Sequence, residues 1–110
     1  MAGWFELNKS TNDQYYFVLK AGNAESILSS EQYVARSSAE NGIASVQANC
    51  AADDRYEKKT STNDKLFFNL KAMNHQVIGT SQMYASEQAR EVGIASVKAN
   101  GVTKTIKDNT

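Results

Sequence analysis

Apolar and polar residues alternate in two stretches of the chain, and the second stretch lies 51 positions after the first. In "QYYFVLKA" at 14–21 every second residue is apolar, and the stretch ending in "LKA" at 70–72 repeats this pattern. A period of two is typical of a strand that buries one face. We therefore predict a strand in each stretch. The inward-facing residues are Tyr15, Phe17, Leu19 and Ala21 in the first, and Leu66, Phe68, Leu70 and Ala72 in the second.

A shorter apolar segment precedes each of these strands. "WFELNK" at 4–9 is better patterned than "RYEKK" at 55–59, but both have the composition of strands. The polar "STND" at 10–13 returns at 61–64 and predicts the turn that joins each pair, because Asn and Asp bond to their own backbone and tolerate left-handed conformations.

A third strand is predicted after a second turn in each stretch. The turns are placed at Asn23 and Asn74, and the strands that follow contain Ile27 and Ile78. Because the turns are short, consecutive strands should pair in the antiparallel sense. Each stretch therefore opens as a meander of three strands.

A helix is predicted next, because apolar residues change to helical spacing and form a narrow stripe. The stripe is Ala39, Ile43 and Val46 in the first stretch, and Ala89, Ile94 and Val97 in the second. Ser37 with Glu40 resembles a capping box, Ser86 is the expected N-cap of the second helix, and Asn49 and Asn100 are the expected ends.

Glycine interrupts both helices, at Gly42 and Gly93. A glycine inside a helix costs about 1 kcal/mol relative to alanine. Such a position usually has a packing reason, so we expect the helix to approach the sheet or the other helix closely there.

The chain is a tandem duplication. With an offset of 51, 20 of the 40 positions from Ser10 to Asn49 are identical to their counterparts, including most of "GIASVQAN" at 42–49 and "GIASVKAN" at 93–100. We place the repeats at 1–52 and 53–110. A unit of this length buries too little surface to be stable alone, so both repeats should share the core of one domain. The duplication supplies an internal symmetric interface, which favours a monomer.

The order "WFEL", "YYFVLKA", an Asn turn, Ser, Tyr and then "GIASVQAN", given twice, resembles the YegP-like family of small bacterial proteins. The resemblance covers essentially the whole chain. It implies an α+β fold of two β-β-β-α-β units that form one antiparallel sheet, with two helices on one face and the C-terminal strand of each unit exchanged into the other. It carries over no activity and no catalytic residue.

The tail "GVTKTIKDNT" at 101–110 also has the composition of a strand. Val102, Thr103, Thr105 and Ile106 are β-branched, which favours extended structure. The family resemblance implies that this strand crosses to the first repeat, where it would cover a sheet edge that is otherwise open to association.

Composition indicates the cellular compartment but identifies no binding partner. Lys and Arg total 12, and Asp and Glu also total 12, so no net field favours nucleic acid or an anionic membrane. The start has no signal-peptide pattern, and no window is apolar over the length that spans a bilayer. Cys50 is the single cysteine, which excludes an internal disulfide and fits a reducing compartment. We expect a cytoplasmic protein.

Candidate catalytic chemistry is sparse. His75 is the single histidine and falls at a predicted turn tip. With Cys50 it supplies two soft ligands, fewer than a tetrahedral zinc site needs, so we expect no metal. The glycines are scattered and form no phosphate loop, so we expect no cofactor and predict no catalytic residue. Glu6 and Glu57 occupy equivalent positions and are expected on the solvent face rather than as an acid-base pair.

The strongest binding candidate is the outward face of the two central strands, where an aromatic ring and a lysine stand four positions apart in each repeat. The candidate residues are Tyr16, Lys20, Phe67 and Lys71. Rings beside cations suit an anionic aromatic ligand, a peptide or a single strand of nucleic acid, and they also suit simple cross-strand pairing. We therefore predict a non-enzymatic binding module. The alternatives are a small enzyme with a shallow site and a structural or stress-associated protein.

Overall fold

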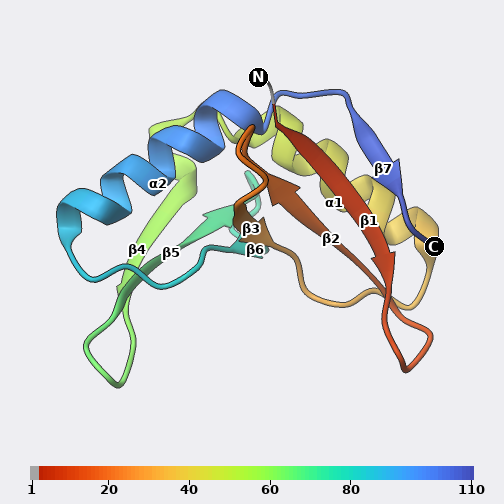
Figure 1. The fold of residues 1–110 in the computed structure, drawn as a ribbon, viewed down its shortest axis with the longest axis horizontal. Coiled ribbons are helices and arrows are strands. Elements are labelled where there is room, and N and C mark those ends of the chain that lie inside the picture. The colour runs from red at the N-terminus through yellow and green to blue at the C-terminus, as the bar shows by residue number, and fades with distance from the viewer. Residues whose placement is uncertain (1–2) are drawn as a thin grey trace.

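The computed structural model describes residues 3–110, which form seven strands, two α-helices and one 3₁₀ turn. The first repeat contains β1 (Trp4–Lys9), β2 (Tyr15–Lys20), β3 (Ser26–Ser29) and α1 (Arg36–Asn49). A 3₁₀ turn (Asp53–Arg55) leads to β4 (Tyr56–Thr60), β5 (Leu66–Lys71), β6 (Val77–Thr80), α2 (Glu87–Asn100) and β7 (Ile106–Asp108). The predicted meanders and helices are confirmed in both repeats. In Figure 1 the helices run along the upper side of an arch, and the two hairpin loops project below it.

The turns adopt the left-handed conformations that their sequences predict. Asp13 and Asp64 have φ of 62° and 63° in the "STND" turns. In the second turns the left-handed residue is the one after asparagine, because Ala24 and His75 both have φ of 69°. The side-chain oxygen of Asn23 accepts a hydrogen bond from the Glu25 amide at 3.1 Å, which stabilises the turn locally.

All seven strands belong to one sheet, in the order β4-β5-β6-β3-β2-β1-β7. The two meanders meet where β3 and β6 pair, with Ser29 opposite Thr80. The predicted crossing of the tail is confirmed, because β7 pairs with β1 of the first repeat. Its pairing is parallel, so the sheet is mixed rather than wholly antiparallel. Three antiparallel pairings lead from β6 through β3 and β2 to β1, so β7 runs opposite to β6, the strand that precedes α2.

The exchange of terminal strands occurs in one direction only. Between the end of α1 at Asn49 and the start of β4 at Tyr56 the chain makes the 3₁₀ turn. This connection is too short to add a strand at the far edge, so β4 is the end strand of the sheet there. The expectation that each unit donates a strand is therefore correct for the second repeat and wrong for the first.

The helix ends differ between the repeats. The Ser86 hydroxyl caps α2 by accepting a hydrogen bond from the Ala89 amide at 3.1 Å, as predicted. The prediction of Ser37 as the cap of α1 is wrong, because the cap lies two residues earlier, at Ala35, which makes no side-chain bond. Arg36 in that first turn pairs with Asp108 of β7, a long-range contact that no local pattern reveals.

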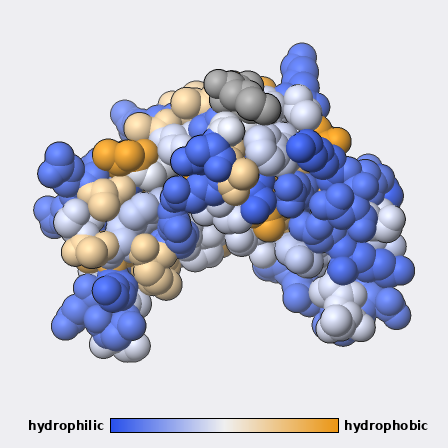
Figure 2. All heavy atoms as spheres, viewed as in Figure 1, coloured by the Kyte–Doolittle hydropathy of each residue, from blue (hydrophilic) through white to orange (hydrophobic). Residues whose placement is uncertain are grey.

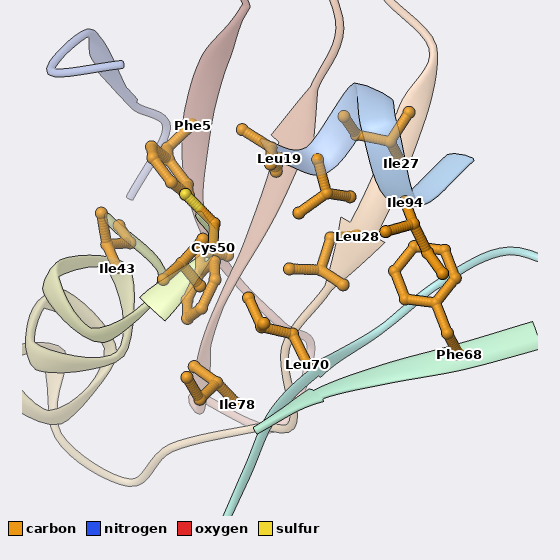
Figure 3. Packing of buried hydrophobic residues seen from close by; sticks show 13 residues of the cluster. Phe5, Leu19, Ile27, Leu28, Ile43, Cys50, Phe68, Leu70, Ile78 and Ile94 are labelled. Atoms are coloured by element: carbon orange, nitrogen blue, oxygen red, sulfur yellow. The ribbon is translucent and has the colours of Figure 1, made fainter. Parts of the chain in front are cut away.

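One hydrophobic cluster joins both repeats (Figure 3). Ile43 and Val46 of α1 and Ile94 and Val97 of α2 pack here with the inward Phe and Leu residues of β2 and β5, so the repeats bury their apolar faces against each other. The predicted Ala89 is only partly buried, and Arg90 is the buried residue of that turn of α2. Cys50 is fully buried in this cluster. The labelled members are Phe5, Leu19, Ile27, Leu28, Ile43, Cys50, Phe68, Leu70, Ile78 and Ile94.

Both helix glycines are sites of close approach, as predicted. A Cβ at Gly42 would lie 2.7 Å from a ring carbon of Phe17 on β2 and 2.8 Å from the Tyr33 hydroxyl. A Cβ at Gly93 would overlap the hydroxyl of Tyr84, the counterpart of Tyr33. The repeated "GIASV" therefore preserves a surface on which a tyrosine ring packs.

Neither helix of the described part of the chain, residues 3–110, combines the length and the apolar character that a membrane span needs.

Candidate functional site on the outer face of the sheet

The outer face of the sheet is the face opposite the two helices. Phe17 and Leu19 of β2 are buried in the same cluster as Ile43 and Val46 of α1, so they point toward the helix. Val18 lies between them and points to the other side, because successive side chains of a strand alternate. The same holds for β5. Figure 2 shows the arch as a surface, with hydrophilic residues over much of the visible side and a hollow between its two lobes.

A line of cross-strand partners runs across the whole outer face, and we call it the central row. Each member stands opposite its neighbour on the adjacent strand, so their side chains lie on one face. The central row consists of Lys107, Glu6, Val18, Ser29, Thr80, Asn69 and Glu57, in the order of the strands from β7 to β4. Its centre lies between β3 and β6, so the two repeats place equivalent residues at equal distances from that centre. Glu6 and Glu57 lie on this solvent face, as predicted.

The four candidate binding residues share the outer face but form two separate pairs. Tyr16 and Lys20 lie two positions before and after the central row on β2, and Phe67 and Lys71 do the same on β5. Two strands separate β2 from β5, which places the pairs about 14 Å apart across the sheet. Because β2 and β5 run in opposite directions, the two aromatic rings lie on opposite sides of the row. One compact ligand therefore cannot contact all four residues.

In the second repeat the lysine is neutralised. The ammonium of Lys71 lies 2.9 Å from a carboxylate oxygen of Glu57, and Asn69 donates to the same carboxylate at 3.3 Å. The ammonium of Lys59 lies 3.8 Å from the other carboxylate oxygen of Glu57. The hydrogen bonds from Lys71 and then Asn69 lower the pKa of Glu57. This half of the outer face is therefore a closed polar network.

In the first repeat the equivalent lysine has a different neighbour. Lys20 stands opposite Trp4, and no described carboxylate lies within ion-pair distance of its ammonium. The indole nitrogen of Trp4 donates to Glu6 at 2.9 Å. Lys107 of β7 places its ammonium 4.2 Å from the centre of the Trp4 ring. The indole of Trp4 therefore bonds the carboxylate of Glu6 and lies under the ammonium of Lys107.

Trp4 and Lys107 were not among the residues that we predicted from the sequence. The offset of 51 places Trp4 opposite Arg55, so the repeat pattern gives no aromatic signal at this position. Arg55 itself turns away to bond the Asn49 side chain at 3.1 Å and Asp54 at 3.1 Å. Lys107 joins the site only because β7 crosses to β1. The sequence feature that could have indicated this site is Trp4, the single tryptophan, because the tail was predicted to cross to the first repeat.

Two equivalent clefts open where a helix of one repeat meets the second turn of the other. The first lies between Tyr33 and Asn41 on one side and Gln76 on the other, with a volume of about 220 Å³. Its counterpart lies between Tyr84 and Asn23, with a volume of about 180 Å³. Pockets for drug-sized ligands usually have volumes of roughly 300–1,000 Å³. The clefts are below this range.

The nucleophilic and titratable candidates lie apart from these clefts. Burial raises the pKa of the Cys50 thiol, which disfavours the reactive thiolate. His75 is exposed in its turn. Among residues 3–110, no three His, Cys, Asp or Glu side chains are grouped so that they could hold a metal ion.

Comparison with known proteins places the chain in a family. The family model described as "Domain of unknown function (DUF1508)" matches twice, at residues 10–57 and 61–108. The chain belongs to this family. Among DUF1508 relatives, UPF0339 protein YegP of Escherichia coli K12 is 66% identical over 110 residues and is covered completely by the match, as is this chain. A UPF0339 protein of Shewanella oneidensis is 62% identical, with complete coverage of both chains.

Solved structures of DUF1508 proteins have the same fold. The solution NMR structure of yegP from E. coli matches with a TM-score of 0.95 at 65% identity, covering 100% of this chain and 95% of that one. The solution NMR structure of the S. oneidensis protein gives 0.92 at 62% identity, covering 98% and 92%. These relatives confirm the family resemblance and the α+β architecture. Their names state no activity.

Proposed function

We propose that the protein is a non-enzymatic binding module that holds an anionic ligand on the outer face of its sheet. The observation that carries this proposal is the contrast between the two equivalent lysines. Glu57 neutralises Lys71, whereas Lys20 stands beside Trp4 and shares its half of the face with Lys107. The first half therefore has cations available to a ligand, and the second half does not.

The ligand class follows from the groups that surround Lys20. The indole of Trp4 offers a flat apolar ring, and the ammonium of Lys107 over that ring and the lysine opposite it on β2 favour a negative charge. We infer a ligand that carries a flat unsaturated ring next to an anionic group. Tyr16 lies about 13 Å further along β2, so a longer ligand would reach a second ring there.

The small-enzyme alternative has less support, because the two clefts are small and neither is lined by Cys50 or His75. We propose that the module works as a cytoplasmic monomer, since β7 covers the β1 edge from within the same chain.

The single tryptophan makes the proposal directly testable, because Trp4 stands in the proposed site. Adenosine monophosphate supplies a flat ring with a phosphate, and adenosine supplies the same ring without the charge. We expect the monophosphate to change Trp4 fluorescence with saturation and to shift the amide signals of β1 and β2. Adenosine should bind more weakly.

Equivalent variants in the two repeats distinguish binding at the proposed site from nonspecific binding. Lys20→Gln should weaken binding of the monophosphate, whereas Lys71→Gln, the same change at the equivalent position, should leave it unchanged. Tyr16→Ser should reduce binding of a short single-stranded oligonucleotide without changing the melting temperature, and Phe67→Ser serves as its counterpart. Equal curves for adenosine and its monophosphate, or equal losses in the two lysine variants, would contradict the proposal.

A further inference from the structure

The two edges of the sheet are equivalent in the duplication but differ in what covers them. β1 and β4 occupy the same place in their repeats, and each pairs with the second strand of its meander. β7 lies on the outer side of β1, whereas β4 ends the strand order with no described strand beyond it. The edge at β4 is therefore the counterpart of a slot that β7 fills at β1.

The filled slot shows what an added strand contacts. Phe5 donates its amide to the Thr105 carbonyl at 2.9 Å, and the Leu7 carbonyl accepts from the Asn109 amide at 2.8 Å. Ile106 stands beside Phe5, and two residues later Asp108 pairs with the first residue of α1, Arg36. An apolar residue followed two positions later by a charged one thus fits the slot at β1.

The backbone of β4 presents part of the same set of groups. The Ser61 amide donates to the Lys65 carbonyl at 2.7 Å across the hairpin, and the alternation of antiparallel pairing then turns the amides of Lys59 and Glu57 toward β5. The amide and carbonyl of Lys58 therefore point outward, as those of Leu7 do at β1. The Tyr56 amide is occupied by the Asp53 carbonyl, which leaves its own carbonyl as a further acceptor.

The charge at the end of this slot is reversed. Glu87 is the first residue of α2 and occupies the place that Arg36 has in α1. Glu91, one turn later, is already paired with Lys58 at 2.7 Å. An acidic residue such as Asp108, which fits beside Arg36, would be repelled by Glu87. Lys58 is the equivalent of Leu7, which stands beside Asp108, but its ammonium is already held by Glu91. The carboxylate of Glu87, for which no ion pair is found within residues 3–110, therefore decides the charge of the slot, which disfavours the tail of a second copy and favours a basic side chain.

We propose that β4 binds an extended segment of a different protein as an eighth, parallel strand, with an apolar residue beside Tyr56 and a lysine or arginine two positions later beside Glu87. The main-chain groups of Lys58 hold the segment, and the pair with Glu87 selects it. The charged side chains of β4 limit self-association of this edge, in keeping with a partner other than a second copy. This surface is distinct from the outer face of the proposed function.

The tail itself provides the probe for a test. The capped peptide VTKTIKDNT, residues 102–110, is compared with the same peptide carrying Asp108→Lys, by titration into the full-length ¹⁵N-labelled protein. We expect the lysine peptide to shift the amide signals of Tyr56, Lys58 and Thr60 with a dissociation constant on the order of 1 mM, because it gains no help from being part of the chain. The native peptide should bind about fivefold more weakly.

Variants of the protein decide whether the slot and the charge act as proposed. Glu87→Arg recreates the environment of Arg36 and should reverse the preference, so that the native peptide binds better. Lys58→Pro removes an outward amide that the fold does not use and should abolish binding of both peptides, whereas Lys58→Ala keeps the amide and should retain it. Adenosine monophosphate should displace neither peptide.

Three results would overturn the inference. The first is the absence of shifts at β4 with the lysine peptide at concentrations well above 1 mM. The second is an unchanged preference between the two peptides in Glu87→Arg. This test does not depend on whether Lys58→Pro folds. The third is equal or tighter binding of the native peptide, which would indicate a second copy as the occupant.

Discussion

The first and second repeats place equivalent side chains on one face of one sheet, yet their surroundings differ. Glu57 gathers Lys71 and Asn69 into a closed network, whereas Glu6 binds Trp4 and leaves Lys20 without a described carboxylate partner. The difference shows that a duplication copies the position of a residue but not its electrostatic state. Neighbours from outside the repeat pattern, such as β7, determine the charges that surround each half of the outer face.

The edges show the same divergence in their packing. Leu7 on β1 is 1% exposed beneath the crossing tail, and its counterpart on β4 is Lys58, whose side chain is 48% exposed. At an open edge the charged end of a lysine is solvated, whereas a leucine there would expose apolar surface. The residue at this position is therefore apolar on the strand that β7 covers and charged on the strand at the open edge. The comparison can be tested by changing equivalent positions in pairs.

The largest expected effect comes from equivalent core residues. Leu19 and Leu70 are both fully buried in the shared cluster. Leu19→Ala and Leu70→Ala should each lower the free energy of unfolding by about 2–5 kcal/mol. Because the core is shared, calorimetry should give one transition in each variant, shifted as a whole. Two separate transitions, with one of them unshifted, would show that the repeats unfold independently.

Removing the tail should have the next largest effect. Truncation after Asn100 leaves β1 without its outer partner and exposes Leu7, whose burial is worth about 1.5–3 kcal/mol. Urea denaturation should show a loss of this size, and amide exchange should show reduced protection in residues 4–30. Lys58→Ala at the open edge is the control and should change stability by less than about 0.5 kcal/mol. Unchanged protection in residues 4–30 would mean that β7 does not stabilise β1.

The helix caps offer a smaller and reciprocal comparison. Ser86→Ala removes the side-chain bond to the Ala89 amide and should cost about 1 kcal/mol in thermal or urea unfolding. Ala35→Ser places a hydroxyl at the equivalent position of α1, where the backbone is already extended with φ of −112° and ψ of 142°. It should raise stability by up to about 1 kcal/mol. No gain from Ala35→Ser would show that the Arg36 contact already serves the first turn of α1.

Acid should act on the covered edge through Asp108, with the smallest effect. Hydrogen bonds from Thr110, and then from Arg36, lower the pKa of Asp108 to about 2, against an ordinary value of 3.8. A lowered carboxyl pKa stabilises the docked tail above pH 3.8, and this contribution is lost as the pH falls through about 2. Trp4 fluorescence should follow the release of Lys107 in this range, and Asp108→Asn should remove that step. Persistence of the step in Asp108→Asn would assign it to another group.

The sequence predicts the local elements well because each depends on residues close together in the chain. Alternation at Phe17 and Leu19 locates β2, and the Asp13 turn locates its hairpin. The direction of β7 depends on the path of the chain after α2, which no local pattern contains. The cap at Ala35 was missed for a similar reason, since the contact of Arg36 comes from residue 108.

The candidate site was predicted in part for the same physical reason. Periodicity places Tyr16 and Lys20 on the outer face, and Phe67 and Lys71 on the same face, but it gives no strand order. Only the order β5-β6-β3-β2 shows that the two pairs are separate. The ion pair of Glu57 with Lys71 likewise depends on the register of β4 against β5, which hairpin length alone does not reveal.

The crossing tail also governs the order in which the protein can be completed during synthesis. Asn8 and Asn109, which hydrogen bond to each other at 3.0 Å, are 101 residues apart along the chain. A ribosome adds about 5–20 residues per second, so the outer side of β1 stays open for roughly 5–20 s after the strand itself emerges. During that interval the nascent first repeat exposes Leu7 and the unpaired amides beside it. Pairing of β7 with β1 is therefore the last step of folding. A nascent chain that stalls before this step exposes an unpaired sheet edge to which chaperones can bind.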